Sequence, residues 1–201
     1  MSKSNALIIL DWDDTLFPTT WVIKNKINLN DEKDKNKYIV FFSQLDNILY
    51  ELLVSFMQHG TVVVVTNAMV KWVNISSDIL PNTKRLIQKN IQIISAREQH
   101  QKDMPGDMFG WKRNIFKKLV LNYYDKSRSQ NIISVGDADY EFKALISLWN
   151  KKRKTRVLKT VRFMRSPTFD SLVDQLEVLS NSVDQICKSS KHMDLKFNIK
   201  Q

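Results

Sequence analysis

The chain has 201 residues, of which 43% are hydrophobic, and it carries a formal net charge of +10 at pH 7. This length and composition allow one sizeable core, so we expect a single core domain over residues 1–190 and not two full domains. A single cysteine, Cys187, excludes an intramolecular disulfide and a thiolate metal cluster. The positive charge favours an anionic partner, which is a phosphorylated substrate, nucleic acid or an acidic membrane surface.

No targeting or membrane-spanning segment is expected from the pattern of apolar residues. Residues 6–10 are the first apolar run, and five residues are too few for the core of a signal peptide. No apolar run approaches the roughly 20 residues needed to span a bilayer. We therefore expect a soluble intracellular protein, in the cytoplasm or the nucleus.

Five short apolar runs alternate with helical patterns and predict the strands of a parallel sheet. They lie at residues 6–10, 61–65, 91–94, 131–135 and 157–163. The first four are almost continuously apolar, as expected for strands that are buried on both faces. In the fifth, Lys159 and Arg162 interleave with apolar residues, which predicts an edge strand. The predicted fold class is α/β, with a parallel sheet of about five strands flanked by helices on both faces.

Helices are expected between these strands, at residues 38–58, 70–80, 111–122, 139–149 and 169–188. The first has the clearest pattern, with apolar residues along one face and a stop at His59-Gly60. Residues 24–37 are rich in Asn, Asp and Lys and have little periodicity, which predicts a short solvated insertion near residues 18–37. Residues 191–201 are expected to form a partly disordered tail.

Three carboxylates stand together where the first strand ends, in the segment Asp11-Trp12-Asp13-Asp14-Thr15-Leu16. A short apolar strand needs no such cluster to fold, and a desolvated carboxylate costs on the order of several kcal/mol unless it is paired or bound to a metal. A divalent cation is the natural compensation. The plainer interpretation is an acidic loop after a strand, which we consider much less favoured.

Polar residues also follow other predicted strands. Thr66 and Asn67 come after the second strand, Lys112 opens a helix, and Asp137 begins an acidic segment after the fourth strand. Ligands of open parallel sheets bind at the carboxyl ends of the strands, so these residues predict one site. In order and spacing, they resemble the motifs of the haloacid dehalogenase (HAD) superfamily over about residues 6–165. This resemblance implies a Rossmann-like core.

The resemblance implies a phosphatase-type member of that superfamily. Asp11 would be the nucleophile that forms an aspartyl-phosphate, and Asp13 the general acid and base. The acid at position 13 points to phosphate-ester hydrolysis, because the superfamily's ATPases have Thr there and its dehalogenases lack that carboxylate. The Thr66 hydroxyl and the Asn67 backbone N–H would bind the phosphoryl oxygens, and Lys112 would supply positive charge.

The same resemblance implies Mg²⁺ as the cofactor. Asp11, the backbone carbonyl of Asp13, Asp137 and Glu141 would hold the ion, since Mg²⁺ prefers oxygen ligands. Asp139 competes with Glu141 for the last of these places. Both acids could instead only favour the start of a helix electrostatically.

Plainer roles remain open for two further residues. Thr66 also suits a capping role at the end of a strand. Lys112 has basic neighbours in the same predicted helix, and most such residues simply solvate a helix face.

Two positions depart from the family pattern, because Trp12 and Asp14 are bulkier than the usual residues there. A phosphotransferase that passes the phosphoryl group to another acceptor would use the same site residues.

The chain leaves little room for the cap insertions by which members of the superfamily select substrates. Residues 17–37 allow at most a short flap, and residues 67–110 must already supply a helix and a strand. An uncovered site would admit large substrates. We therefore expect a macromolecular phosphorylated substrate, either a phosphoprotein or a phosphate end of a nucleic acid.

Residues 151–165 contain eight basic residues and no acidic ones, namely Lys151, Lys152, Arg153, Lys154, Arg156, Lys159, Arg162 and Arg165. They suggest an alternative function, a catalytically weak module of the same fold that binds nucleic acid or another partner through this surface. The plainer interpretation is a solvated edge strand and loop that stays charged to prevent edge pairing.

Overall fold

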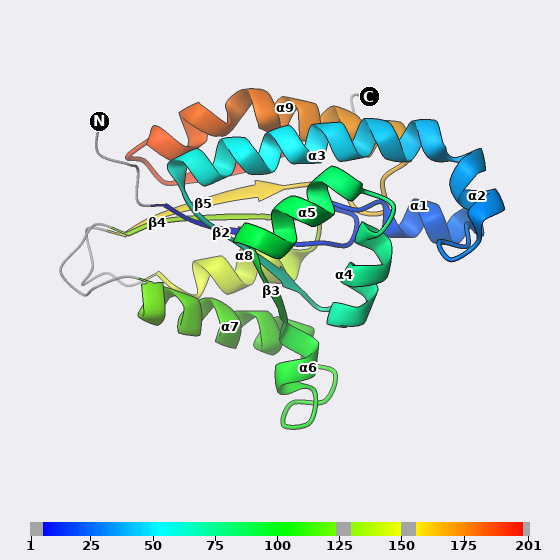
Figure 1. Cartoon of the computed structure of the whole chain (residues 1–201). Coiled ribbons are helices and arrows are strands. Elements are labelled where there is room, and N and C mark those ends of the chain that lie inside the picture. The colour runs from blue at the N-terminus through cyan, green and yellow to red at the C-terminus, as the bar shows by residue number, and fades with distance from the viewer. Residues whose placement is uncertain (1–5, 124–129, 150–155, 199–201) are drawn as a thin grey trace.

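The computed structural model describes residues 6–123, 130–149 and 156–198, which form a central parallel sheet between two layers of helices (Figure 1). The strands are β1 (Ala6–Leu10), β2 (Gly60–Thr66), β3 (Gln92–Ser95), β4 (Gln130–Gly136), β5 (Arg156–Arg162) and β6 (Met193–Lys196). Their order in the sheet is β3-β2-β1-β4-β5-β6, and every neighbouring pair is parallel. The predicted α/β class with a Rossmann-like sheet is confirmed.

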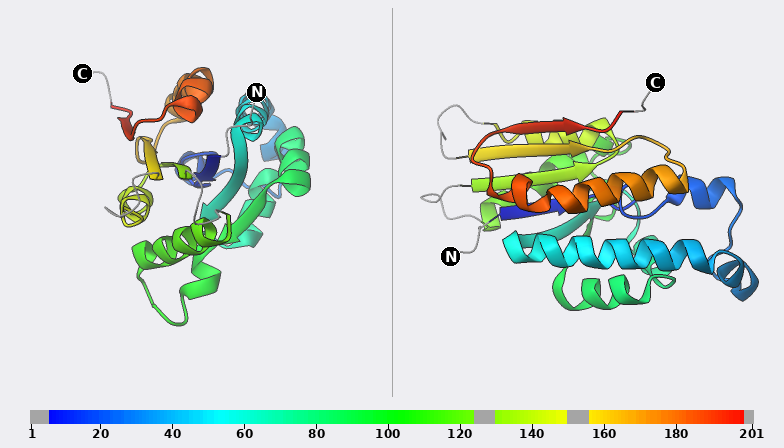
Figure 2. Two further views of the ribbon diagram at one scale, coloured as in Figure 1. Left: turned by 90° about the vertical axis from the view of Figure 1, so that its left-hand side faces the viewer. Right: turned by 90° about the horizontal axis from the view of Figure 1, so that it is seen from above.

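Helices cover both faces of the sheet. One layer contains α3 (Ile39–His59), α4 (Val70–Ser77), α5 (Pro81–Asn90) and α9 (Phe169–Lys188). The other contains α6 (Ala96–His100), α7 (Met108–Tyr123) and α8 (Asp139–Ile146). The right-hand view of Figure 2 shows α3 and α9 side by side over the sheet. Two short helices, α1 (Thr19–Lys24) and α2 (Glu32–Lys37), lie beside the N-terminal end of α3 (Figure 1).

The central strand β1 explains why its sequence is apolar without interruption. Ala6, Ile8 and Leu10 belong to the core beneath α3 and α9. Leu7 and Ile9 belong to the core beneath α7 and α8. Since side chains alternate between the two faces of a strand, a sheet covered on both faces requires apolar residues at every position.

The prediction that the fifth strand lies at an edge is wrong. A sixth strand, β6, pairs with β5 from Lys159 opposite Met193 to Arg162 opposite Lys196, so β5 is internal. β6 also lies within the segment that was expected to be a disordered tail. This strand has only four residues, and its side chains are mostly exposed, so it lacks the apolar pattern by which strands are predicted.

Four helices of the described residues were not predicted, namely α1, α2, α5 and α6. The insertion near residues 18–37 contains α1 and α2, and the Asp31 side chain begins α2 by accepting a hydrogen bond from the Lys33 N–H at 2.9 Å. Helix α5 begins at Pro81, a favoured position in a first turn. The buried carboxylate of Asp46 on α3 accepts a hydrogen bond from the Thr83 N–H at 2.8 Å, so α5 is capped from another helix.

The length and composition of helix α3 bear on the expectation that no segment of the chain could span a membrane. By length and composition alone, this 21-residue helix is apolar enough to cross a membrane. Its residues Phe42, Leu45 and Leu49 are buried in the same core cluster as Leu172 and Leu176 of α9. Such a helix is only weak evidence for a membrane span, because core helices also pass this test.

Candidate active site

The strand register brings three of the predicted site residues to one edge of the sheet. Leu10, the last residue of β1, pairs with Val64 of β2 and Val135 of β4. The Asp11 N–H continues this pairing by donating to the Val135 carbonyl at 2.9 Å. The segments that begin at Asp11, Thr66 and Asp137 therefore leave the sheet at its carboxyl edge, where ligands of such sheets bind.

A buried ionic cluster lies at the centre of this edge. The Lys112 ammonium, on α7, donates to Asp11 Oδ1 at 2.7 Å and also to Glu141 Oε1 on α8. All three side chains are buried, and Lys112 has no exposed surface. Gly136 allows this arrangement because a Cβ there would lie 2.4 Å from Glu141 Cγ. Lys112, and not a basic neighbour in the same helix, is thus the cation that contacts Asp11.

The structure also separates the two candidate acids of α8. One oxygen each from Asp11, Asp137 and Glu141 lies within 4.8 Å of the others. Asp139 is outside this group, because it is largely exposed and forms an ion pair with Arg165 at 2.9 Å. Glu141, which competed with Asp139 in the sequence, is therefore the one beside Asp11.

Electrostatics within the cluster favour an additional cation. Burial raises the pKa of Asp11 well above its ordinary value, against the effect of Lys112, and the neighbouring carboxylates raise it further. Burial and the charge of Glu141 likewise raise the pKa of Asp137 to about 7. Burial alone would lower the pKa of Lys112, but Asp11 and Glu141 outweigh it and raise that pKa above its usual range. One ammonium compensates three carboxylates only in part.

This donor set fits a divalent cation such as Mg²⁺. Carboxylate oxygens are the ligands that Mg²⁺ prefers, and the three candidate oxygens are close enough for one ion. Glu141 is already committed through both oxygens, because Oε1 contacts Lys112 and Oε2 accepts a hydrogen bond from the Ala138 N–H at 3.0 Å. Asp11 and Asp137 are therefore the side chains that have free oxygens for direct ligation, with Glu141 beside them.

Asp13, two residues after Asp11, has a different environment. Its Oδ1 accepts a hydrogen bond from the Trp72 indole N–H at 2.7 Å and another from the Thr19 hydroxyl at 2.5 Å. Its Oδ2 faces the Thr66 hydroxyl at 3.4 Å. The side chain is half-buried, and these hydrogen-bond donors are neutral. Asp11 and Asp13 therefore differ in their partners. Asp11 contacts a charged ammonium, whereas Asp13 accepts hydrogen bonds from neutral groups.

The two unusual residues of this loop have structural roles. Asp14 has a positive φ of 52°, a conformation that Asp tolerates better than most residues. Its carboxylate accepts hydrogen bonds from the Thr20 N–H, at 2.8 Å, and from the Thr20 hydroxyl, which fixes α1 to the loop. Trp12 is fully buried, stacks on Phe17 and donates to the Ser76 hydroxyl on α4 at 2.8 Å.

The second predicted motif lies beside Asp13. The buried Thr66 hydroxyl accepts a hydrogen bond from the Ala68 N–H at 2.9 Å, so it caps the turn after β2 as well as facing Asp13. The Asn67 side chain donates to the Met108 carbonyl at 3.4 Å. Exposed side chains of Met69 and Met108 flank this turn.

Two neighbours of Asp13 were not identified as site residues. Trp72 and Thr19 lie outside the motifs predicted from the sequence. They are 59 and 6 residues from Asp13 in the chain. Their proximity to Asp13 depends on how α4 and α1 pack against the loop, which no local pattern predicts.

The basic run at residues 151–165 does not form a continuous solvated surface where it is described. Arg156 and Lys159 are buried, Arg162 forms an ion pair with Asp194, and Arg165 pairs with Asp139. The expectation of a solvated edge strand here is wrong, because β6 covers this side of β5. Lys151, Lys152, Arg153 and Lys154 lie outside the described residues.

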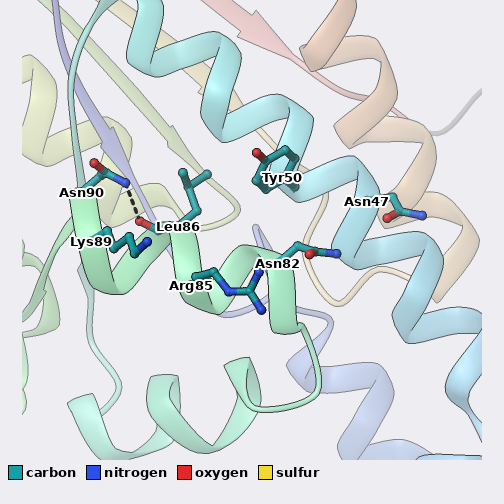
Figure 3. A pocket seen from close by; sticks show the side chains of 7 residues that line it. All are labelled: Asn47, Tyr50, Asn82, Arg85, Leu86, Lys89 and Asn90. Carbon is teal, nitrogen blue, oxygen red and sulfur yellow. Dashed lines mark hydrogen bonds between the residues drawn. The ribbon is translucent and has the colours of Figure 1, made fainter.

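A separate hollow of about 500 Å³ lies between α3 and α5 (Figure 3). Its lining residues are Asn47, Tyr50, Asn82, Arg85, Leu86, Lys89 and Asn90. None of these is a residue of the ionic cluster, and none has a carboxylate that could hold a cation. The predicted site residues therefore lie at the carboxyl edge of the sheet and not in this hollow.

Comparisons with known proteins give one structural likeness. No protein-family model matches the sequence, and no curated protein has significant similarity to it. Among solved structures, the HAD domain of effector protein Lem4 from Legionella pneumophila is similar over 89% of this chain and 97% of that chain. The sequence identity is 9% and the TM-score is 0.43.

Proposed function

We propose that this protein is a Mg²⁺-dependent phosphohydrolase that cleaves phosphate monoesters through an aspartyl-phosphate on Asp11. The observation that carries the proposal is the contact between Lys112 and Asp11 inside a cluster of three carboxylates. A fourth carboxylate, that of Asp13, lies on the same loop as Asp11 and has its own hydrogen-bond partners. A structural ion pair does not need this surplus of buried negative charge. A site that binds a cation and a phosphoryl group does.

The two environments suit two different tasks. A nucleophile must stay ionised, and the Lys112 ammonium favours the ionised form of Asp11. A bound Mg²⁺ supplies the further positive charge that offsets repulsion between this carboxylate and a phosphate dianion. Asp13 is proposed as the general acid and base, and its hydrogen-bond partners Trp72, Thr19 and Thr66 are all neutral.

The proposed reaction has two steps. An oxygen of Asp11 forms a bond to phosphorus while the ester P–O bond breaks, and Asp13 gives its proton to the leaving oxygen. Water then attacks the phosphorus and passes a proton to Asp13, which releases phosphate and restores the Asp11 carboxylate. Thr66 and the Asn67 backbone N–H are proposed to bind the phosphoryl oxygens, and Lys112 to share their charge.

A large substrate is compatible with the small insertion near residues 18–37, which forms only the short helices α1 and α2 in the described residues. Trp21 of α1 packs against Tyr38, Phe42 and Phe169, with ring centroids 5.6, 6.2 and 5.1 Å away. This packing holds α1 against α3 and α9, while Thr19 at the start of α1 contacts Asp13. The loop after α6 extends away from the sheet in Figure 1.

A hollow next to the ionic cluster also suits an extended anionic substrate. It has a volume of about 480 Å³, begins at Asp137 and runs past the ends of β5 and β6. Arg162, Arg165 and Lys196 line it, and Arg162 and Arg165 are paired there with Asp194 and Asp139. We propose a phosphoprotein or a phosphate end of a nucleic acid as the substrate, with phosphopeptides, end-phosphorylated oligonucleotides and sugar phosphates as the assay panel.

The proposal is tested by the Asp11→Asn substitution. We expect Mg²⁺-dependent release of phosphate from an aryl phosphate to fall by at least about 1000-fold, because the nucleophile is lost. Mass spectrometry of acid-quenched wild-type protein should detect phosphate on the peptide that contains Asp11. Asp14→Asn is the matched control, since it changes the same group on the same loop but leaves an oxygen that can still bond to Thr20. Equal turnover by the wild type and Asp11→Asn would contradict the proposal.

A further inference from the structure

We propose that Trp72 and Thr19 are positioning residues that orient the Asp13 carboxyl group, so that Oδ2 is the oxygen that exchanges a proton with the substrate. This inference rests on the proposed function and adds to it a role for two residues outside the predicted motifs. It concerns one carboxylate whose two oxygens have different partners.

The two oxygens of Asp13 differ in how many hydrogen bonds they accept and how long these are. Oδ1 accepts hydrogen bonds from the Trp72 indole N–H, at 2.7 Å, and from the Thr19 hydroxyl, at 2.5 Å. A carboxyl oxygen that already accepts two hydrogen bonds has no lone pair left in its plane for a proton. When Asp13 is protonated, the proton therefore lies on Oδ2.

The other oxygen, Oδ2, is on the side of the proposed phosphoryl site. It accepts one long hydrogen bond, at 3.4 Å, from the Thr66 hydroxyl, which is one of the groups proposed to bind the phosphoryl oxygens. Rotation of the carboxyl group would exchange the two oxygens and would break both hydrogen bonds to Oδ1. Trp72 and Thr19 thus hold the proton on the side where the ester oxygen leaves.

Packing fixes the Trp72 ring relative to the loop after β1, which carries Asp11, Asp13 and Phe17. The ring meets Phe17 of that loop edge to face, with centroids 6.0 Å apart. The Ser76 hydroxyl donates to the Trp72 carbonyl at 2.8 Å and accepts a hydrogen bond from the Trp12 indole N–H at 2.8 Å. Helix α4 and the loop are therefore connected at three points: through Asp13, Phe17 and Trp12.

In the step that breaks the ester bond, the Asp11 oxygen bonds to phosphorus, the ester oxygen leaves with the bonding electron pair, and the proton on Asp13 Oδ2 moves to that oxygen. A good leaving group departs without this proton, whereas an alcohol does not. Misorientation of Asp13 should therefore slow alkyl phosphates much more than activated aryl phosphates.

The test compares kcat/KM of the wild type and Trp72→Phe over a series from dinitrophenyl phosphate through phenyl phosphate to an alkyl phosphate. The ratio kcat/KM reports the steps up to departure of the alcohol. We expect a loss of less than about threefold for the dinitrophenyl ester and of about 10- to 100-fold for the alkyl ester. Thr19→Val should show the same trend, and Thr19→Ser, which keeps the hydroxyl, should restore the wild-type pattern.

Trp21→Phe is the matched control, because Trp21 is also half-buried and packs in the same aromatic region through Phe42. It should leave the dependence on the leaving group unchanged, and thermal unfolding of all variants checks that they are folded. An equal loss for every ester in Trp72→Phe, or no loss, overturns the inference alone. A wild-type protein that hydrolyses none of the esters with Mg²⁺ overturns the proposed function and this inference with it.

Discussion

Lys112 and Lys159 are fully buried, and their surroundings differ. At the carboxyl edge of the sheet, Lys112 contacts the carboxylates of Asp11 and Glu141. On the face of β5, the Lys159 ammonium donates to the Ile186 carbonyl at 2.6 Å and contacts the Cys187 carbonyl at 3.4 Å. Burial lowers the pKa of both, but carboxylates reverse the effect at Lys112, whereas the pKa of Lys159 falls to about 8.

The comparison shows that the charge of the partners, and not burial, distinguishes a candidate catalytic lysine from a structural one. Carbonyls at the end of α9 have no partner within the helix, and Lys159 satisfies two of them. This is a sufficient structural reason for its position. Lys112 contacts side chains whose combined charge it does not balance, and that surplus is what calls for a ligand.

The largest expected effect comes from making the same substitution at both lysines. Lys112→Met should lower phosphatase activity by at least about 100-fold and destabilise the fold by about 3 kcal/mol, because it leaves Asp11 and Glu141 buried without their cation. Lys159→Met should keep activity within about twofold, since it lies outside the site. Hydrolysis of an aryl phosphate and urea unfolding measure both effects.

Circular dichroism at the assay temperature checks that each variant is folded before its activity is compared. Similar losses of activity in Lys112→Met and Lys159→Met would contradict the claim that contact with carboxylates distinguishes a catalytic lysine from a structural one.

Asp137→Asn tests whether the surplus of negative charge is real. Folding raises the pKa of Asp137 from 3.8 to about 7, so the folded state holds a proton that the unfolded chain releases between about pH 4 and 7. The metal-free wild type should therefore lose about 2 kcal/mol of stability between pH 5 and pH 8 through this group, and Asp137→Asn should not.

Thermal unfolding with and without Mg²⁺ at pH 8 extends this test. Added Mg²⁺ should stabilise the wild type and have a much smaller effect on Asp137→Asn, because a ligand that binds the folded state raises its stability. Asp139→Asn is the matched control, since Asp139 pairs with Arg165 outside the cluster. An equal effect of Mg²⁺ on all three proteins would argue against a cation beside Asp137.

The smallest expected effect sharpens the interpretation of Lys159. Its pKa is lowered by folding, so the unfolded chain binds a proton that the folded state releases between about pH 8 and 10.5. Stability should therefore rise with pH through this group, by about 1 kcal/mol between pH 7 and pH 9. Lys159→Met should lack this increase. Urea unfolding of both proteins at the two pH values measures it, and an identical pH dependence would contradict a lowered pKa.

The sequence alone predicted five strands of the sheet and which residues would meet at its carboxyl edge. Apolar runs located five strands, because a strand covered on both faces needs apolar residues at every position. Polar residues after those runs, such as Asp11 and Thr66, were expected to meet, because parallel strands end at one edge. Lys112 was also identified, and the structure places its ammonium 2.7 Å from Asp11.

Tertiary structure decided what depends on contacts between distant segments. The strand β6 is too short and exposed to have an apolar pattern, and it exists by pairing with β5. The sequence favoured Glu141 but left Asp139 as a competitor, and the orientation of α8 turns Glu141 toward Lys112 and Asp139 toward Arg165. The hydrogen bond from Trp72 to Asp13 joins residues 59 positions apart, so its existence depends on the packing of whole helices and not on any local sequence pattern.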